Sequence, residues 1–185
     1  MRYNELTFQG RNAVLEAFRS GKTIDKLFIL DGCQDGPIKS IVREAKKTDA
    51  IINYVDKERL DRLAGTGHHQ GVVAIGAAYE YAEVEDILAA AKEKGEDPFI
   101  FILDEIEDPH NLGAIIRTAN LAGAHGVIIP KRRAVGLTAT VAKTSAGAIN
   151  YTPVAKVTNI SQTIEELKKQ GLWFVCADMG GETMY

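Results

Sequence analysis

Cysteine is scarce in this sequence, and long apolar runs are missing. Among 185 residues only Cys33 and Cys176 are cysteines, and their separation matches no metal-binding or redox motif. We therefore expect two reduced thiols in a cytoplasmic protein. No apolar run approaches the roughly 20 residues that a membrane-spanning helix needs, and residues 1–5 lack an apolar secretory segment, so we expect no membrane partner.

Metal ligands and net positive charge are also in short supply. His68 and His69 are adjacent and would point in different directions, and no third ligand lies near them, so we expect no metal site. A formal net charge of −3 mildly disfavours a nucleic-acid binder, because such domains are usually basic. Local basic clusters do occur near the amino terminus and after Pro130, with solvated surfaces as the alternative: Arg2, Arg11, Arg19, Lys22, Lys26, Lys131, Arg132 and Arg133.

The composition that is present suits a soluble globular chain. Hydrophobic residues make up 45% of the sequence and charged residues 25%. A chain of this length can bury a core as one large or two small domains.

Residues 99–130 predict a parallel β-α-β unit around which the rest of the chain is organised. Residues 99–103 and 127–129 are unbroken apolar runs, typical of strands buried on both faces. Asp108 is a good N-cap and Pro109 suits the first position of a helix. One face of that helix is expected to pack on the sheet, because apolar residues recur at helical spacing: Leu112, Ile115, Ile116, Ala119 and Ala122.

The flanking segments predict further alternation of strands and helices. Residues 1–77 predict a small α/β domain, with a loop at 7–11, strands at 26–30, 51–55 and 71–75, and helices at 13–18, 38–45 and 57–63. We interpret the acidic residues 78–98, with a short helix at 87–91, as a linker and a hinge. Beyond Pro130 we expect helices at 137–149 and 160–170, strands at 151–157 and 172–178, and a turn at 179–181.

Asn111, Gly113 and Arg117 bring candidate chemistry to the central helix. A glycine inside a helix costs roughly 1 kcal/mol against alanine, so Gly113 needs a reason, and close approach by another backbone is one. That approach would bring a ligand or a second subunit to Arg117, a charged donor suited to phosphate or ribose oxygens. The alternative is that Asn111 helps to cap the helix and Arg117 is a solvated charge.

Four blocks of sequence, in order, resemble one enzyme family. Residues 108–113 with Arg117-Thr118-Ala119 resemble the motif N-x-G-x-x-x-R-T-A of the SpoU (TrmH-type) RNA ribose 2′-O-methyltransferases, members of the SPOUT superfamily. Residues 143–148 resemble a second shared block, and residues 10–14 and 69–74 resemble the family's amino-terminal RNA-binding domain. The nearest resemblance is to bacterial 23S rRNA guanosine 2′-O-methyltransferases.

The resemblance implies a fold and a division into domains. Residues 1–77 would form a ribosomal-protein-like α/β domain that binds the RNA substrate, and 78–98 the linker. Residues 99–185 would form the first half of a SPOUT α/β domain, which is Rossmann-like and normally carries a trefoil knot.

The cofactor site implied by the resemblance is expected beyond Tyr185. The family's later motifs, G-S-E-G-x-G and I-P-M-x-G-x-x-x-S-L-N-x-S, build the knot and hold S-adenosylmethionine, and neither occurs here. We therefore expect a fragment that does not bind the cofactor and is inactive alone.

The resemblance also implies roles for individual residues and partners. Arg117 and Asn111 would be catalytic, with S-adenosylmethionine as methyl donor and rRNA as substrate, in a homodimer. Contacts to RNA would come from both parts of the chain: Arg11, Asn12, His69, Gln70, Lys131, Arg132 and Arg133. Arg11 and Asn12 lie at a helix N-terminus, which suits a phosphate, although plain helix entry remains the alternative.

Two other functions stay open at this stage. In a non-catalytic RNA-binding module of ribosomal-protein type, residues 99–185 would be purely structural. A nucleotide-binding enzyme of Rossmann type is disfavoured, because the turn after Leu103 lacks G-x-G-x-x-G and carries acids that would repel a pyrophosphate.

Overall fold

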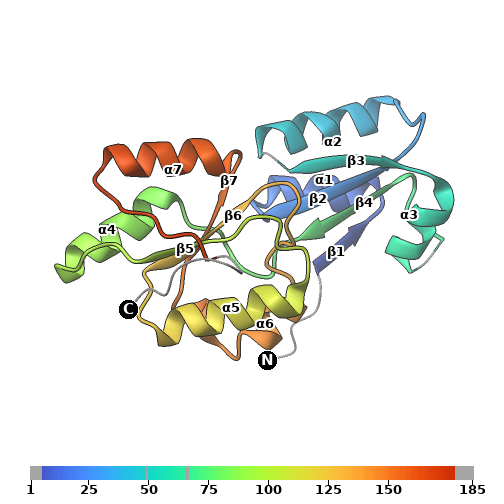
Figure 1. Cartoon of the computed structure of the whole chain (residues 1–185). Helices are drawn as coiled ribbons and strands as arrows, with labels where there is room; N and C mark the ends of the chain where they lie inside the picture. Colours follow the sequence, from blue (N-terminus) through green and yellow to red (C-terminus); the bar gives the residue numbers. More distant parts are fainter. Residues whose placement is uncertain (1–5, 49, 66, 178–185) are drawn as a thin grey trace.

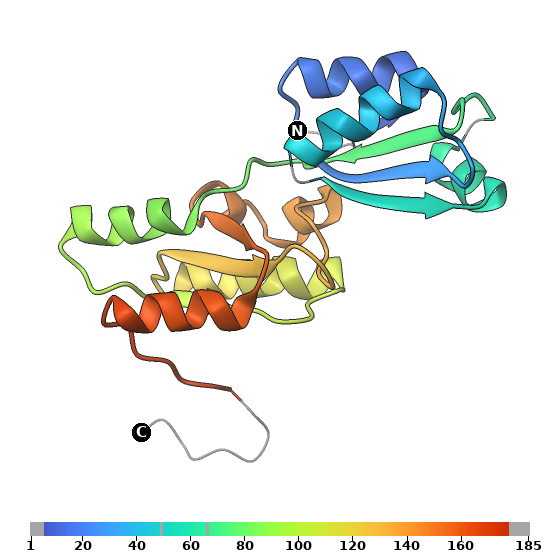
Figure 2. The same ribbon diagram turned by 90° about the horizontal axis from the view of Figure 1, so that it is seen from above.

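The computed structural model describes residues 6–48, 50–65 and 67–177, and within these residues the strands form two β-sheets. Helices cover both faces of each sheet, and the two sheet units are joined by a single pass of the chain (Figures 1 and 2). The predicted α/β class is confirmed. No helix in this described part of the chain is long and apolar enough to cross a membrane.

The first unit contains the sheet with strand order β1-β4-β2-β3. Strands β1 and β2 both pair antiparallel with β4, whereas β3 pairs parallel with β2. Helices α1 and α2 cover one face and α3 the other (Figure 1). The elements are β1 (Leu6–Gln9), α1 (Arg11–Arg19), β2 (Ile24–Leu30), α2 (Gly36–Lys47), β3 (Ile51–Val55), α3 (Lys57–Ala64) and β4 (Val72–Gly76).

Alternation along β2 divides the first unit into two apolar cores. Leu27 and Ile29 pack with Ile41 of α2 on one face of the sheet. Phe28 points the other way and packs with Leu60 of α3. The strand therefore needs apolar residues at successive positions, which is the pattern that identified it in the sequence.

The loop expected at residues 7–11 is wrong, because Leu6–Gln9 forms strand β1. Its backbone pairs with β4, from Leu6 opposite Gly76 to Gln9 opposite Val73. β1 has only four residues and is held by pairing with a strand that is distant in the chain. Its own sequence therefore shows no periodicity that would predict a strand. The other helices and strands expected in this unit are confirmed, with ends that differ by at most two residues.

The second unit contains a parallel sheet with strand order β5-β6-β7. Helices α5 and α6 pack on one face, and α4 and α7 on the other (Figure 1). The elements are α4 (Val84–Lys94), β5 (Ile100–Ile102), α5 (Pro109–Leu121), β6 (Gly126–Pro130), α6 (Ala139–Thr144), the 3-10 helix η1 (Ala148–Asn150), β7 (Val154–Val157) and α7 (Ile160–Lys169).

The predicted β-α-β unit is confirmed as β5-α5-β6, with one correction. All five residues of β6 are buried, as expected for a central strand. The three residues of β5 are only half-buried, so the expectation of burial on both faces at 99–103 is wrong. β5 lies at the edge of the sheet within the described residues, and an edge strand keeps one side open.

Two later elements also differ from expectation. The helix expected at 137–149 is interrupted, because Ala146 and Gly147 have φ values of 50° and 91°, which a right-handed helix cannot contain. Residues 172–177 form no strand. Leu172 and Phe174 pack against the core under α4 and α7 while Trp173 is exposed, so successive side chains alternate between buried and exposed as in a strand. Strand assignment also needs a pairing partner, which these residues lack among those described.

Residues 78–98, which we expect to be a linker, contain a helix that packs on the second sheet. Helix α4 is longer than predicted, and its Ile87 is buried against Ile128 of β6 and Leu167 of α7. The segment between the two sheet units is thereby reduced to roughly residues 77–83. The exact domain boundary stays a prediction.

Three expectations fall on the carboxyl-terminal end of the chain, which lies outside the described residues. They concern Asp178, the turn at 179–181, and Tyr185, beyond which we expect the cofactor site. All three therefore stay predictions.

Candidate functional site

Helix α5 carries the two side chains that the sequence singles out for catalysis. The carboxylate of Asp108 accepts a hydrogen bond from the His110 N–H (2.9 Å), so the helix begins at Pro109 as predicted. Asn111 is exposed in the first turn, and Arg117 is exposed further along. The guanidinium of Arg117 has no hydrogen-bond or ion-pair partner in the part of the chain that the structure describes. It is therefore open to an oxygen ligand.

The close approach predicted at Gly113 comes from the same chain. A Cβ atom at Gly113 would lie 2.8 Å from the Cβ of Thr144 and 3.0 Å from the backbone nitrogen of Ser145. The Thr144 hydroxyl also donates hydrogen bonds to the carbonyls of Thr140 (2.9 Å) and Pro109 (3.3 Å). Gly113 thus lets the end of α6 lie on the first turn of α5, which brings residues 143–148 beside the motif that contains Arg117.

The basic residues after β6 lie at the same sheet edge as the start of α5. Arg132 and Arg133 are exposed, and Lys131 is half-buried. Arg133 Nη1 lies 3.1 Å from Glu105 Oε1, in the turn that precedes α5. The carboxyl ends of parallel strands meet at this edge, where ligands of α/β sheets gather. The structure therefore brings this basic cluster and the first turn of α5 together.

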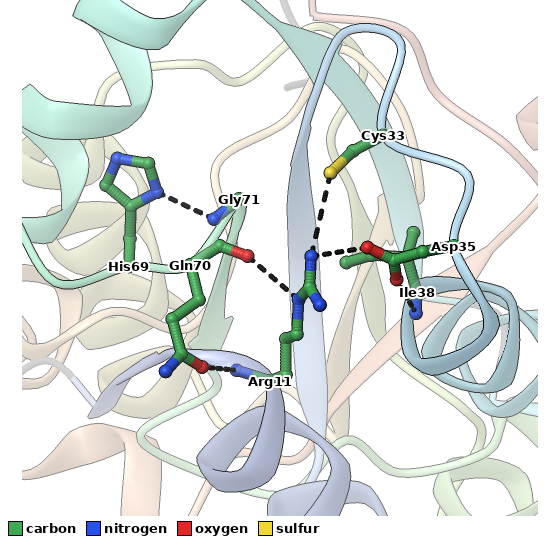
Figure 3. A network of polar contacts seen from close by, with 7 residues as sticks. All are labelled: Arg11, Cys33, Asp35, Ile38, His69, Gln70 and Gly71. Atoms are coloured by element: carbon green, nitrogen blue, oxygen red, sulfur yellow. Dashed lines mark hydrogen bonds and ion pairs between the residues drawn. The ribbon is translucent and has the colours of Figure 1, made fainter.

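Arg11 lies in a polar network at one end of the first sheet (Figure 3). Its guanidinium forms an ion pair with Asp35 and donates through Nε to the Gln70 carbonyl (3.1 Å), while its backbone N–H donates to Gln70 Oε1 (3.2 Å). Arg11 Nη2 also lies 4.0 Å from the sulfur of Cys33. Arg11 therefore joins the start of α1 to two loops, whereas the neighbouring Asn12 is exposed.

His69 is enclosed by its own chain. The residue is only 5% exposed. Its Nδ1 accepts a hydrogen bond from the Gly71 N–H (3.0 Å), so Nε2 carries the hydrogen and donates it to Asp61 Oδ1 (2.9 Å). With both ring nitrogens hydrogen-bonded inside the protein, His69 holds the loop before β4. Its predicted contact with RNA stays a prediction.

One cluster was missed by sequence reasoning. Asp25, Tyr81 and Lys156 meet at a pocket of about 430 Å³ between the two units. The only sequence signal was a carboxylate, Asp25, at the beginning of a mostly apolar strand. An acidic residue at such a position has to find a partner, but the sequence does not say which one.

Two family models match successive parts of the chain. Residues 9–82 match the family "RNA 2′-O ribose methyltransferase substrate binding", and residues 98–185 match the "SpoU rRNA Methylase family". A putative TrmH family tRNA/rRNA methyltransferase of Bacillus subtilis is 54% identical over 169 residues, which are 91% of this chain and 68% of that protein. One of Staphylococcus haemolyticus is 47% identical over 181 residues, 98% of this chain and 72% of its own. The chain belongs to the SpoU (TrmH) family of RNA methyltransferases.

Solved structures overlap with this chain less closely. The AdoMet-bound rRNA methyltransferase from Sinorhizobium meliloti is 22% identical, with a TM-score of 0.41, over 89% of this chain and 58% of that one. The SpoU methyltransferase AviRb from Streptomyces viridochromogenes is 18% identical, with a TM-score of 0.43, over 90% and 59%. The chain spans less than two thirds of either structure.

Proposed function

We propose that this chain forms part of an enzyme that transfers a methyl group from S-adenosylmethionine to a ribose 2′-hydroxyl of rRNA, on a guanosine of 23S rRNA. The observation that carries the proposal is the exposed guanidinium of Arg117, which has no partner among the described residues and lies one turn after Gly113 on a helix with the family's motif. Family membership supports RNA methyl transfer. The ribose oxygen and the guanosine are inferred from the resemblance in sequence.

Arg117 and Asn111 would act on the ribose. A hydroxyl is a poor nucleophile, so it has to be positioned and its developing negative charge offset. The planar donors of Arg117 suit the ribose and the adjoining phosphate. Because a guanidinium stays protonated in proteins, we assign Arg117 to positioning and charge stabilisation rather than to proton removal. Asn111, in the first turn of the same helix, would orient the ribose or Arg117 itself.

The pocket between the two units does not fit S-adenosylmethionine. The carboxylate of Asp25 lines the pocket between the units and could face a sulfonium, but Lys156 and Tyr81 already occupy its two oxygens. When bound, S-adenosylmethionine would supply the methyl group on a positively charged sulfur. A cofactor site beyond Tyr185 remains our proposal.

For RNA contact we propose side chains at the two sheet ends, four of them exposed and Lys131 half-buried: Asn12, Gln70, Lys131, Arg132 and Arg133. Arg11 and His69, which the sequence also suggests, are less exposed and hold the loops through their guanidinium and ring nitrogens. Gln70 and Arg133 also have partners within the protein, but their side chains stay exposed. Phosphate contacts of this kind make affinity strongly dependent on salt. We also propose that the enzyme is a homodimer, which sedimentation of the protein at its relatives' full length would test.

The test is methyl transfer to a 23S rRNA fragment by the protein extended to the length of its relatives. With a radioactive methyl donor we expect label in RNA that resists alkaline hydrolysis at one position, because a 2′-O-methyl group removes the nucleophile of that cleavage. The variant Arg117→Ala should lose about 10²- to 10³-fold in kcat, and Lys169→Ala on α7 should behave as wild type. Normal turnover by Arg117→Ala would remove Arg117 from the mechanism.

The alternative is a non-catalytic RNA-binding module of ribosomal-protein type. RNA binding without any methyl transfer by the extended protein would favour that function. Label released on alkaline hydrolysis in mononucleotides, with the methyl group on the base, would instead retain methyl transfer and contradict the ribose as acceptor.

A further inference from the structure

A buried ion pair joins the two sheet units. Lys156 Nζ of β7 lies 2.5 Å from Asp25 Oδ1 of β2, and these side chains are 14% and 6% exposed. The Tyr81 hydroxyl donates to Asp25 Oδ2 (3.0 Å) and accepts from Lys156 Nζ (3.2 Å) and from the Leu137 N–H (2.9 Å). Four segments that are distant in the chain therefore meet in one hydrogen-bonded cluster.

The position of Asp25 is produced by a bulge in β2. Ile24 pairs with Gly76 of β4 and Lys26 pairs with Ile75, so Asp25 is an extra residue with no partner of its own on β4. A bulge bends a strand and re-aims the side chain it carries. Here it directs a carboxylate out of the first unit and into contact with the second.

The loop after β6 lies directly against this carboxylate. A Cβ atom at Gly136 would lie 2.9 Å from Asp25 Cγ and 3.0 Å from the Tyr81 hydroxyl, so only glycine lets the backbone pass. The same loop carries the exposed Arg132 and Arg133. The cluster therefore holds the basic loop as well as the two sheets.

The connecting segment is hydrogen-bonded through its backbone to both units. The Ala77 N–H donates to Thr23 of the first unit (2.9 Å). The Ala78 N–H donates to Leu137 (2.8 Å) and the Ala82 N–H to Val154 (2.9 Å), both in the second unit. Figure 2 shows the chain crossing once between the units at this point. Short directional bonds of this kind select one orientation, which loose apolar contact would not do.

We propose that Asp25, Tyr81 and Lys156 are positioning residues that hold the two sheet units in one relative orientation, so that RNA held by the first unit meets Arg117 at a fixed distance. The connection between the two units, which we expect from the sequence to be a hinge within residues 78–98, is then rigid. We call this rigid connection, made by the three side chains and the segment 77–83, the joint. The second half of the inference rests on the proposed function, whereas the joint itself does not.

The joint is tested by the distance between spin labels on the two units. Labels are placed at the exposed Lys39→Cys on α2 and Lys169→Cys on α7, in a background with Cys33→Ser and Cys176→Ser. We expect one narrow distance distribution in this background and a broader one with Asp25→Asn or Lys156→Met. The matched control is Glu165→Gln with Lys168→Met, an exposed ion pair within α7 (2.8 Å), which should leave the distribution narrow.

Circular dichroism shows whether each variant is folded, and Tyr81→Phe, which loses only the hydroxyl, serves if the charge variants do not fold. An unchanged narrow distribution in folded variants overturns the joint.

In the extended enzyme, Asp25→Asn should lower kcat about tenfold or more, with KM for RNA within about twofold of wild type. Broadened distances with wild-type kcat overturn the positioning role. Absence of methyl transfer by the wild-type enzyme contradicts the proposed function instead, and the distances still decide the joint.

Discussion

Tyr81 shows what burial and neighbouring charge do to one ionisable side chain. Its pKa is raised well above the ordinary value of 10.0, first because burial removes water from the phenolate, and then because the Asp25 carboxylate repels a second negative charge. The hydrogen bond from the Leu137 N–H lowers the pKa and so acts in the opposite direction. The hydroxyl therefore remains a donor to Asp25 throughout the physiological range.

This shift predicts a dependence of stability on alkaline pH. The pKa of Tyr81 is higher in the folded than in the unfolded chain. Its contribution to the free energy of unfolding is therefore fully present below about pH 10 and is lost as pH rises through the pKa of the folded state. The free energy of unfolding in urea should therefore fall more steeply above pH 10 for wild type than for Tyr81→Phe. Equal slopes from pH 9 to 11 would show that Tyr81 does not titrate differently in the two states.

The role proposed for Arg117 predicts a loss of activity even when its positive charge is kept. Replacing Arg117 with lysine keeps the positive charge but removes the planar fork of donors. We expect the extended enzyme with Arg117→Lys to lose about 10²-fold in kcat and to keep its affinity for RNA. Activity close to wild type would mean that charge alone is sufficient and that the fork has no role.

At the scale of single elements, the contact between α5 and α6 depends on the absence of one methyl group. Gly113 lies under Thr144 and Ser145, where a Cβ atom has no room. The sequence identified this glycine as one that needs a reason, and the reason is packing within the chain. Arg117 is left exposed because it lies on another face of the same helix from the buried Leu112 and Ile116.

Gly113→Ala should therefore destabilise the protein in spite of alanine's higher helix propensity. Overpacking typically costs about 1–3 kcal/mol, against about 1 kcal/mol gained in propensity, so we expect a net loss of up to about 2 kcal/mol. Thr118→Ala, at an exposed site on the same helix, is the control and should stay within about 0.5 kcal/mol of wild type. A variant Gly113→Ala that is more stable than wild type in urea would contradict the contact.

Prediction of elements succeeded where the signal was local. The start of α5 follows from Asp108 and Pro109, which act within one turn. It failed for β1 and for residues 172–177, since strand formation depends on whether a distant partner pairs with the backbone. The break at Ala146 and Gly147 was also missed, because an alanine with positive φ has no sequence signature.

For the whole molecule, the ion pair between Asp25 and Lys156 predicts a strongly non-additive pair of substitutions. Removing one partner leaves a buried charge alone, which typically costs about 3–5 kcal/mol. Removing both together, as Asp25→Asn with Lys156→Met, leaves no unpaired charge. The double variant should therefore be more stable in urea than either single variant. Additive losses would indicate that the two side chains do not interact in solution.

Cofactor binding is also a property of the whole protein. We expect titration calorimetry to detect no tight binding of S-adenosylmethionine to the 185-residue chain, since it contains neither of the family's two later motifs. The protein at its relatives' full length should bind measurably under the same conditions. Tight binding by the 185-residue chain would show that these residues suffice for the site.

Sequence alone determined the α/β class, the β5-α5-β6 unit and the family, because apolar periodicity, helix caps and motif spacing are local properties of the chain. The candidate residues Arg117 and Asn111 came from the same local information. Only the tertiary structure decided that Arg11 and His69 bond within the protein, that Thr144 lies on Gly113, and that Asp25 reaches Lys156. Those contacts join residues far apart in the chain, and their partners are chosen by packing in three dimensions, which no single segment encodes.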